Sequence, residues 1–309
     1  MDKILECKNV SKQIGRFCLK NINFSIEPGY ILGIVGSTGS GKSTLVRLLL
    51  GSLVIESYLK ESSCVSKSDM ENGGRIYANG YCLQRESKEY KEQMAFILND
   101  CPFGMKLSAK ENGEWFGAFY PDFSMERYKQ FCKEYQVPFE KPLRDLSKGE
   151  QIKMQLAFAM TRDVKVFVFD EPAGNLDVKF RETFYEIMRE LVADGTKSIV
   201  YVTHLVEELE QIGDYILWIE EGEQLEFGPL EEVLDRYWIY EGAKHVLKGL
   251  DEKEKSRIFV MEKENPVHYE ALLHSTKEEL PENVGKNCRR AELKEILYGV
   301  LEQRKEVKV

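Results

Sequence analysis

Short apolar runs, separated by glycine, proline and polar residues, set the pattern of the first 100 residues. Residues 4–26 contain segments that alternate between apolar and polar positions, which predicts two or three antiparallel strands. The run 30–35 predicts a short buried strand, and the apolar run 45–50 predicts a buried helix that ends at Gly51. A further short strand is expected at 94–98.

Helical spacing replaces this pattern in residues 100–146, which are also rich in aromatic residues. Ser108 is placed to cap a helix that runs to Tyr120, and Ser124 is placed to cap a second one. The aromatic residues of the second helix recur on one face, so we interpret them as core rather than as a surface that stacks on bases.

From residue 147 the chain alternates between helices and apolar strands. A helix is predicted at 148–161, an apolar strand at 164–169, another buried strand at 198–202, and a hairpin at 215–227. Strands that are apolar on both faces are typical of a parallel sheet that is covered by helices on both sides. The sequence therefore predicts an α/β fold.

Two segments depart from the pattern. Residues 52–74 are rich in Ser, Glu and Lys and predict a surface loop. Past about residue 236 the sheet pattern fades and Lys and Glu become dense. We therefore divide the chain into a main domain, 1–236, and a small accessory domain, 237–309, with a final helix at 291–301; the alternative for the second part is a partly disordered tail.

The amino-acid composition limits the classes of partner and the cellular compartment that we expect for this protein. The chain has 309 residues, 43% of them hydrophobic, and a net charge of -9, which argues against nucleic acid as the main partner. No run of 18 apolar residues is present, and the N-terminus lacks the apolar core of a signal peptide. The seven cysteines are scattered, which favours reduced thiols in the cytoplasm.

The most specific motif is the glycine-rich run after the first buried strand. It fits G-x-x-x-x-G-K-[ST], between a predicted strand and a predicted helix. Glycines let backbone N–H groups converge on a triphosphate, and a helix N-terminus adds positive potential there. Lys42 is expected at the β- and γ-phosphates of ATP, and the Ser43 hydroxyl at Mg²⁺. The expected ATP-binding residues are Gly36, Ser37, Thr38, Gly39, Ser40, Gly41, Lys42, Ser43 and Thr44.

A second motif is the apolar strand 166–169, which ends in Asp170 and Glu171. This arrangement is typical of Mg²⁺-dependent nucleotide hydrolysis, in which one carboxylate holds the metal and the other orients the attacking water. Neighbouring residues of a strand point in opposite directions, so the two cannot share one role. We expect Asp170 at the metal and Glu171 at the water.

A third motif, LSKGEQ, begins at Leu146. Ser147 and Glu150 have the spacing of a capping box at the start of an apolar helix. The capping box is a sufficient local explanation, although it does not explain why the motif lies about 20 residues before Asp170.

In this order the motifs resemble those of the ATP-binding subunit of an ABC (ATP-binding cassette) transporter. GSTGSGKST resembles the Walker A motif, LSKGEQ the signature, VFVFDEP Walker B, and AGNLD, which ends at Asp177, the D-loop. His204 lies where the family has its switch histidine. The resemblance spans residues 3–235. It implies a P-loop NTPase core with a mixed or parallel sheet, an antiparallel N-terminal β-subdomain and a helical subdomain at about 100–160.

The resemblance also implies a composite site. Two cassettes, in a homodimer or in a heterodimer with a similar subunit, sandwich two ATP molecules, and each ATP faces the signature of the other subunit. In this arrangement Glu171 and His204 are catalytic and Asp177 belongs to the D-loop. The implied signature residues are Ser147, Lys148, Gly149 and Glu150.

Three departures from the family pattern change individual expectations. Lys148 and Glu150 stand where glycine and glutamine are usual, whereas the other two signature residues are kept. Asn99 takes the place of the Q-loop glutamine that reaches Mg²⁺ or water, and it is one methylene shorter. Ile14 takes the place of the aromatic residue that stacks on adenine, and Phe17 is our candidate replacement.

The function that follows is ATP hydrolysis that powers a separate membrane permease. The long C-terminal extension resembles subunits of bacterial ABC-2-type exporters, so we expect a cytoplasmic protein on the inner face of the membrane. Two alternatives are a regulatory cassette that binds ATP with little hydrolysis and a soluble ABC-type ATPase that is not involved in transport. A steady-state ATPase assay separates the first alternative from the leading hypothesis.

Overall fold

The computed structural model describes residues 3–55, 74–250, 258–260 and 269–307. The chain divides into two compact units. The first comprises Met1–Leu205 and Ile212–Phe227, and the second comprises Val206–Gln211 and Gly228–Val309. The second unit thus begins earlier than the boundary at residue 237 that the fading sheet pattern suggested. Most of the predicted 52–74 loop lies outside the described residues.

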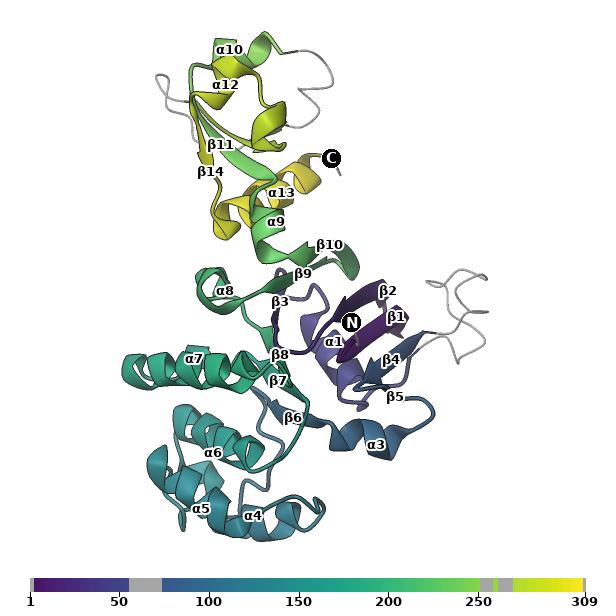
Figure 1. Ribbon diagram of the computed structural model, residues 1–309, viewed down its shortest axis with the longest axis vertical. Helices are drawn as coiled ribbons and strands as arrows, with labels where there is room; N and C mark the ends of the chain where they lie inside the picture. The colour runs from purple at the N-terminus through teal and green to yellow at the C-terminus, as the bar shows by residue number, and fades with distance from the viewer. Residues whose placement is uncertain (1–2, 56–73, 251–257, 261–268, 308–309) are drawn as a thin grey trace. The chain divides into compact units, whose positions relative to one another are not determined.

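A ten-stranded sheet organises the first unit (Figure 1), in the order β5-β4-β1-β2-β10-β9-β3-β8-β7-β6. β1 is antiparallel to β2 and β4, whereas β3, β8, β7 and β6 are parallel to their neighbours in this part of the sheet. The predicted mixed sheet with an antiparallel N-terminal part is confirmed. The strands are β1 (Leu5–Ile14), β2 (Phe17–Ile26), β3 (Ile31–Val35), β4 (Arg75–Ala78), β5 (Tyr81–Cys82), β6 (Met94–Ile97), β7 (Val166–Asp170), β8 (Ser198–Val202), β9 (Tyr215–Glu220) and β10 (Glu223–Pro229).

The parallel strands are apolar because both faces of the sheet are covered. Every residue of β3 and β8 is buried, and side chains such as Ile34, Val168, Val200 and Leu217 belong to one core cluster. Burying each such side chain contributes roughly 1.5–3 kcal/mol. The helices of this unit are α1 (Lys42–Leu49), α3 (Ser87–Glu92), α4 (Ala109–Gly117), α5 (Met125–Glu134), α6 (Lys148–Met160) and α7 (Val178–Ala193).

Helices α4, α5 and α6 form a helical layer beside the β6 edge of the sheet (Figure 1). Ser108 and Ser124 cap α4 and α5 as predicted, each by accepting a backbone N–H three residues later. Tyr128 of α5 and Tyr135 at its C-cap are buried, and the Tyr128 ring lies 5.8 Å from the ring of Phe158 on α6. The interpretation of these rings as core is confirmed.

The second unit contains a four-stranded antiparallel sheet in the order β12-β13-β11-β14. Its described elements follow one another as β11-α10-β12-β13-α12-β14, which is the split βαβ topology of ferredoxin-like folds. The described part of this unit is thus a folded domain. The elements are α8 (Val206–Ile212), α9 (Leu230–Leu234), β11 (Tyr237–Gly242), α10 (Lys244–Lys248), β12 (Ile258–Val260), β13 (Tyr269–His274), α12 (Glu282–Gly285), β14 (Cys288–Arg290) and α13 (Leu293–Val307).

Two further observations bear on the sequence-based expectations. Five of the described cysteines are free, in agreement with the expectation of reduced thiols. Among the described residues, no helix is long and apolar enough to cross a membrane.

Candidate active site

The candidate site lies where four parallel strands of the first unit end. The carboxyl ends of β3, β8, β7 and β6 meet at one edge of the sheet, which is where α/β proteins bind ligands. The glycine-rich loop from Gly36 follows β3, His204 follows β8, Asp170 ends β7, and Asn99 follows β6. The parallel topology therefore gathers four of the predicted elements, although they are scattered over about 170 residues of sequence.

The glycines of the loop are required by its backbone. Gly36 has φ +151° and Gly41 has φ +119°, both in the region that L side chains rarely adopt. A Cβ atom on Gly36 would lie 2.0 Å from the carbonyl oxygen of Ile219, so that neither a β-carbon nor a larger side chain fits. The loop thus curves tightly into the N-terminus of α1, as anion binding requires.

Lys42 sits beneath this loop and holds it. Its Nζ atom donates hydrogen bonds to the carbonyl oxygens of Gly36 at 2.7 Å and Ser37 at 2.9 Å. The side chain is almost completely buried, and burial lowers the pKa of Lys42, an effect that the nearby carboxylates of Glu171 and Glu220 oppose. The ammonium group is therefore fixed next to the position that a phosphate would take.

Glu220 is a residue of this region that the sequence-based reasoning missed. It ends β9, is buried, and accepts the backbone N–H of Ser37 at 3.0 Å as well as the Ser37 hydroxyl. It thus ties the glycine-rich loop to a strand 183 residues away. Its signal in the sequence is a carboxylate at the end of an apolar run, which is the same signal that identified Asp170.

Asp170 and Glu171, at the end of β7, differ in their backbone conformation and in their surroundings. Burial, followed by the charge of Glu171, raises the pKa of Asp170 to about 6. Glu171 has a positive φ of 50°, and its N–H group donates to the carbonyl oxygen of Val202 at 2.9 Å. This backbone turn brings its carboxylate to His204, whose Nδ1 atom is 3.6 Å from Oε1 of Glu171.

A cavity opens above the glycine-rich loop. It joins six of the nine predicted phosphate-binding residues to Glu171, His204 and Phe17 in one concave surface, whereas Gly36, Ser37 and Ser40 do not line it, and neither does Asp170. The Phe17 ring also packs under the loop, since a Cβ atom on Gly41 would lie 2.9 Å from it. Ile14, by contrast, is 43% exposed and does not line this cavity. The lining residues are Phe17, Thr38, Gly39, Gly41, Lys42, Ser43, Thr44, Glu171 and His204.

The signature segment does not line this cavity, although it is well formed. Ser147 and Glu150 make the predicted reciprocal capping box at the start of α6. Gly149 lies against the backbone of Asn175, because a Cβ atom there would be 2.7 Å from the Asn175 carbonyl oxygen. Lys148 extends to the carbonyl oxygen of Asn99 at 3.5 Å.

The D-loop aspartate has a local structural role. Asp177 is the N-cap of α7, where it accepts the N–H of Phe180 at 2.9 Å, and it forms an ion pair with Lys153 at 3.2 Å. Both interactions lower the pKa of Asp177. Neither Asp177 nor Asn99 lines the cavity above the glycine-rich loop.

Comparison with known proteins places this site in a family. The family model for "ABC transporter" matches residues 19–174, which is half of the chain. The chain belongs to the ABC transporter family. It is therefore an ABC-type ATPase, and ATP binding is a property of its family domain. The matched region begins in β2 and ends just after Glu171, so it includes the glycine-rich loop and the signature.

Among its relatives are ATP-binding proteins of several transporters. The chain is 25% identical to the ABC transporter ATP-binding protein YtrB of Bacillus subtilis (strain 168), over 76% of this chain and 75% of the relative. It is 26% identical to NatA of the same organism, over 70% of this chain and 84% of the relative. It is 28% identical to the xylose import ATP-binding protein XylG of Yersinia pestis, of which it covers only 43%.

Solved structures share the fold of the first unit. A structure described as the ATP binding subunit of an ABC transporter matches 74% of this chain and 91% of its own, with a TM-score of 0.63 and 22% identity. The ATP-binding cassette MJ0796, solved as a dimer bound to ADP and phosphate, matches 73% of this chain and 98% of its own, with a TM-score of 0.61 and 22% identity. These likenesses confirm the predicted P-loop ATPase fold.

Proposed function

We propose that this chain is the ATP-hydrolysing subunit of a transporter whose membrane-spanning permease is a separate polypeptide. The observation that carries this proposal is the cavity in which Lys42, Ser43, Glu171 and His204 meet. Its elements have the roles that a nucleotide triphosphatase needs: a cradle for phosphates, a fixed cation and a carboxylate close to a histidine. The names of the relatives support coupling to transport.

Mg²⁺ fits the donors of this site. The Ser43 hydroxyl and the Asp170 carboxylate are hard oxygen donors, and Mg²⁺ is usually held by one or two carboxylates together with substrate phosphates and water. The raised pKa of Asp170 shows that its negative charge is poorly compensated by the protein. A divalent cation held by these two residues would supply that compensation and would also neutralise charge on the triphosphate.

Glu171 is the residue that we assign to the attacking water. Its carboxylate lines the cavity and is one-third exposed, so a water molecule has access to it. His204 lies next to it, with its Nδ1 atom at 3.6 Å, and is placed to orient the same water or the γ-phosphate. This pair also argues against the alternative of a regulatory cassette with little hydrolysis, because binding alone requires neither group.

The signature completes the site from a second subunit. Ser147 and Gly149 lie at the N-terminus of α6, which favours anions, yet they do not line the cavity of their own chain. Two such helix ends can face one triphosphate if two chains pair head to tail. We therefore propose a homodimer, or a heterodimer with a similar cassette, that encloses two ATP molecules.

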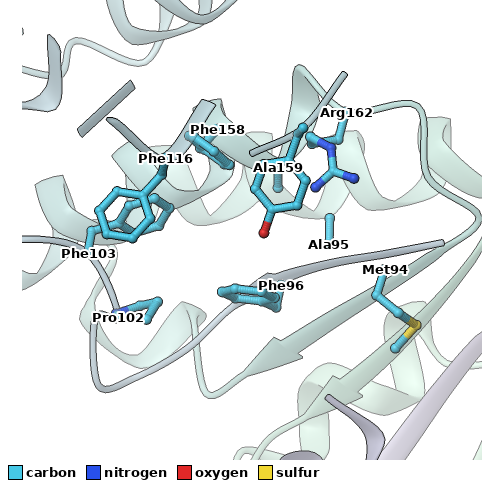
Figure 2. Close-up of a pocket in the computed structure, with 10 residues that line it drawn as sticks. Met94, Ala95, Phe96, Pro102, Phe103, Phe116, Phe158, Ala159 and Arg162 are labelled. Carbon is cyan, nitrogen blue, oxygen red and sulfur yellow. The ribbon is translucent and has the colours of Figure 1, made fainter. Parts of the chain in front are cut away.

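The helical layer offers a surface for the permease. A small apolar pocket opens between β6 and helices α4 and α6 (Figure 2). Phe116 and Tyr120 line it, and their neighbours Trp115 and Phe119 are 69% and 76% exposed. Large aromatic residues exposed in this way mark interaction sites. We propose that an apolar cytoplasmic segment of the permease binds here.

The test is co-purification from membranes with a double variant, Trp115→Ala with Phe119→Ala. We expect wild-type protein to retain one multi-span membrane protein, identified by mass spectrometry, and the double variant to lose at least tenfold of it. ATPase activity of the isolated subunit should stay unchanged. Val178→Ala, at a side chain that is 75% exposed on α7, is the matched control. Equal recovery with all three proteins would refute this surface, and no multi-span partner for the wild type would refute the proposed function.

A further inference from the structure

One buried side chain connects the signature helix to the segment that carries Asn99. Gln155 lies on α6 and is only 1% exposed. Its Oε1 atom accepts the backbone N–H of Leu98 at 2.9 Å, and its Nε2 atom donates to the carbonyl oxygen of the same residue at 3.0 Å. The side-chain amide of Gln155 therefore hydrogen-bonds to both the backbone N–H and the carbonyl oxygen of Leu98.

The position of Leu98 explains why such a contact is useful. Among the described strands β6 is the last one at its side of the sheet and ends at Ile97, so none of them lies beyond it to continue the ladder. Gln155 takes the place of a neighbouring strand for one residue. Buried backbone and amide groups are costly unless they are hydrogen-bonded, which makes this geometry specific.

Helix α6 connects this contact to the signature. It begins at the signature, with Ser147 as its N-cap, and Gln155 follows eight positions later, which is about 12 Å along the helix axis. Lys148, at the first position of the same helix, reaches the carbonyl oxygen of Asn99 at 3.5 Å. One rigid helix thus holds two consecutive residues, Leu98 and Asn99, at two separate points.

We propose that Gln155 is a positioning residue for ATP hydrolysis. It makes the Leu98–Asn99 segment move together with the signature helix. When a second subunit binds the signature, Asn99 is therefore positioned at the same time. The inference rests on the proposed active site, because it concerns the neighbour of Asn99. Gln155 touches neither the cavity nor any residue that lines it in the contacts described above.

The test compares Gln155→Met, which is similar in size but cannot make either hydrogen bond, with Tyr128→Phe. Tyr128 is a buried residue of the same helical layer whose hydroxyl donates to the carbonyl oxygen of Ala109 at 3.1 Å. Both changes remove buried hydrogen bonds, but only the first one affects Leu98. Gln155→Leu is a second variant, in case the methionine variant does not fold.

Two readouts are needed. We expect hydrogen exchange of the peptide that spans residues 95–103 to be at least tenfold faster in Gln155→Met. We also expect kcat for ATP to fall about tenfold while the dissociation constant for ATP changes less than twofold. Tyr128→Phe should keep both the exchange rate and kcat of the wild type, even where its melting temperature is lower.

Each contrary result has a definite meaning. Unchanged exchange in Gln155→Met would overturn the contact, and faster exchange with unchanged kcat would overturn its role in hydrolysis. An equal loss of kcat in Tyr128→Phe would show general destabilisation and overturn the inference as well. A wild-type protein without ATPase activity would refute the proposed function, whereas an active wild type with an equally active Gln155→Met variant refutes only this inference.

Discussion

Replacing Asp170 by asparagine should stabilise the ATP-free protein and abolish its activity. The carboxylate is mostly buried beside Glu171, and its pKa is raised from 3.8 to about 6. The folded state therefore holds this proton more tightly than the unfolded state, and stability falls as pH rises between these two values. Above pH 6 the full cost is present, because the charged form must be buried. Asparagine, which is neutral at every pH, avoids this cost.

The magnitude follows from the shift. A difference of about 2 pKa units corresponds to about 3 kcal/mol at pH 8, at 1.36 kcal/mol per unit. At pH 5 only the part of the shift between pH 3.8 and pH 5 counts, so the destabilisation is about 1.5 kcal/mol. For a unit of this size, each kcal/mol moves the melting temperature by about 2–4 °C. Asp170→Asn should thus melt about 6–12 °C above the wild type at pH 8, and about half of that at pH 5.

Thermal unfolding of both proteins at pH 5 and pH 8, without nucleotide, measures this difference. Asp177→Asn is the matched control, because the pKa of Asp177 is lowered, first by the hydrogen bond from Phe180. The contribution of the Asp177 carboxylate to stability is complete above pH 3.8 and is lost only at lower pH. The difference in melting temperature between Asp177→Asn and the wild type should therefore be the same at pH 5 and pH 8. The reasoning is refuted if Asp170→Asn is less stable than the wild type, or if its advantage is the same at both pH values.

Two further predictions concern the cavity. Glu171→Gln should bind ATP, dimerise at saturating MgATP and turn over at least about 100-fold more slowly; near wild-type turnover would assign the water to another group, and a monomer in light scattering would contradict the two-chain site. Phe17→Ala should weaken ATP binding by roughly 1–3 kcal/mol if the ring stacks on adenine. An unchanged dissociation constant would mean that this ring, which packs beneath Gly41, is only core.

The parts of the fold that the sequence predicted well are those set by local rules. Ser108, Ser124 and Ser147 each begin a helix at the expected residue, because a capping side chain bonds only to N–H groups two or three residues away. The predicted strand 198–202 has the bounds of β8 because the apolar run Ile199–Val202, with Ser198 before it, lies between Lys197 and Thr203. The predictions agree with the structure where the residues that determine an element lie within one helical turn or one strand of it.

The site was predictable to the extent that its residues lie in motifs. Glu220 and Gln155 lie in none, and each acts on a partner that is distant in sequence: Ser37, 183 residues away, and Leu98, 57 residues away. A buried glutamine within an apolar helix is visible as an anomaly in the sequence, but its partner depends on which strand lies at the sheet edge. That strand order is a global property of the fold, which no window of the sequence contains.

The second unit shows the same limit at the level of domains. Its boundary was expected where the sheet pattern fades, as if a domain were one continuous segment. Helix α8, which begins two residues after His204, instead groups with the C-terminal residues. There Glu210 accepts the N–H of Leu293 at 2.5 Å, at the start of α13, and Glu207 pairs with Lys294 at 2.8 Å. A carboxylate at a helix N-terminus is stabilising, so α8 supplies part of the cap that α13 needs. The strand that leads to His204 therefore continues directly into a helix whose partners lie more than 80 residues later, and only the folded chain reveals that link.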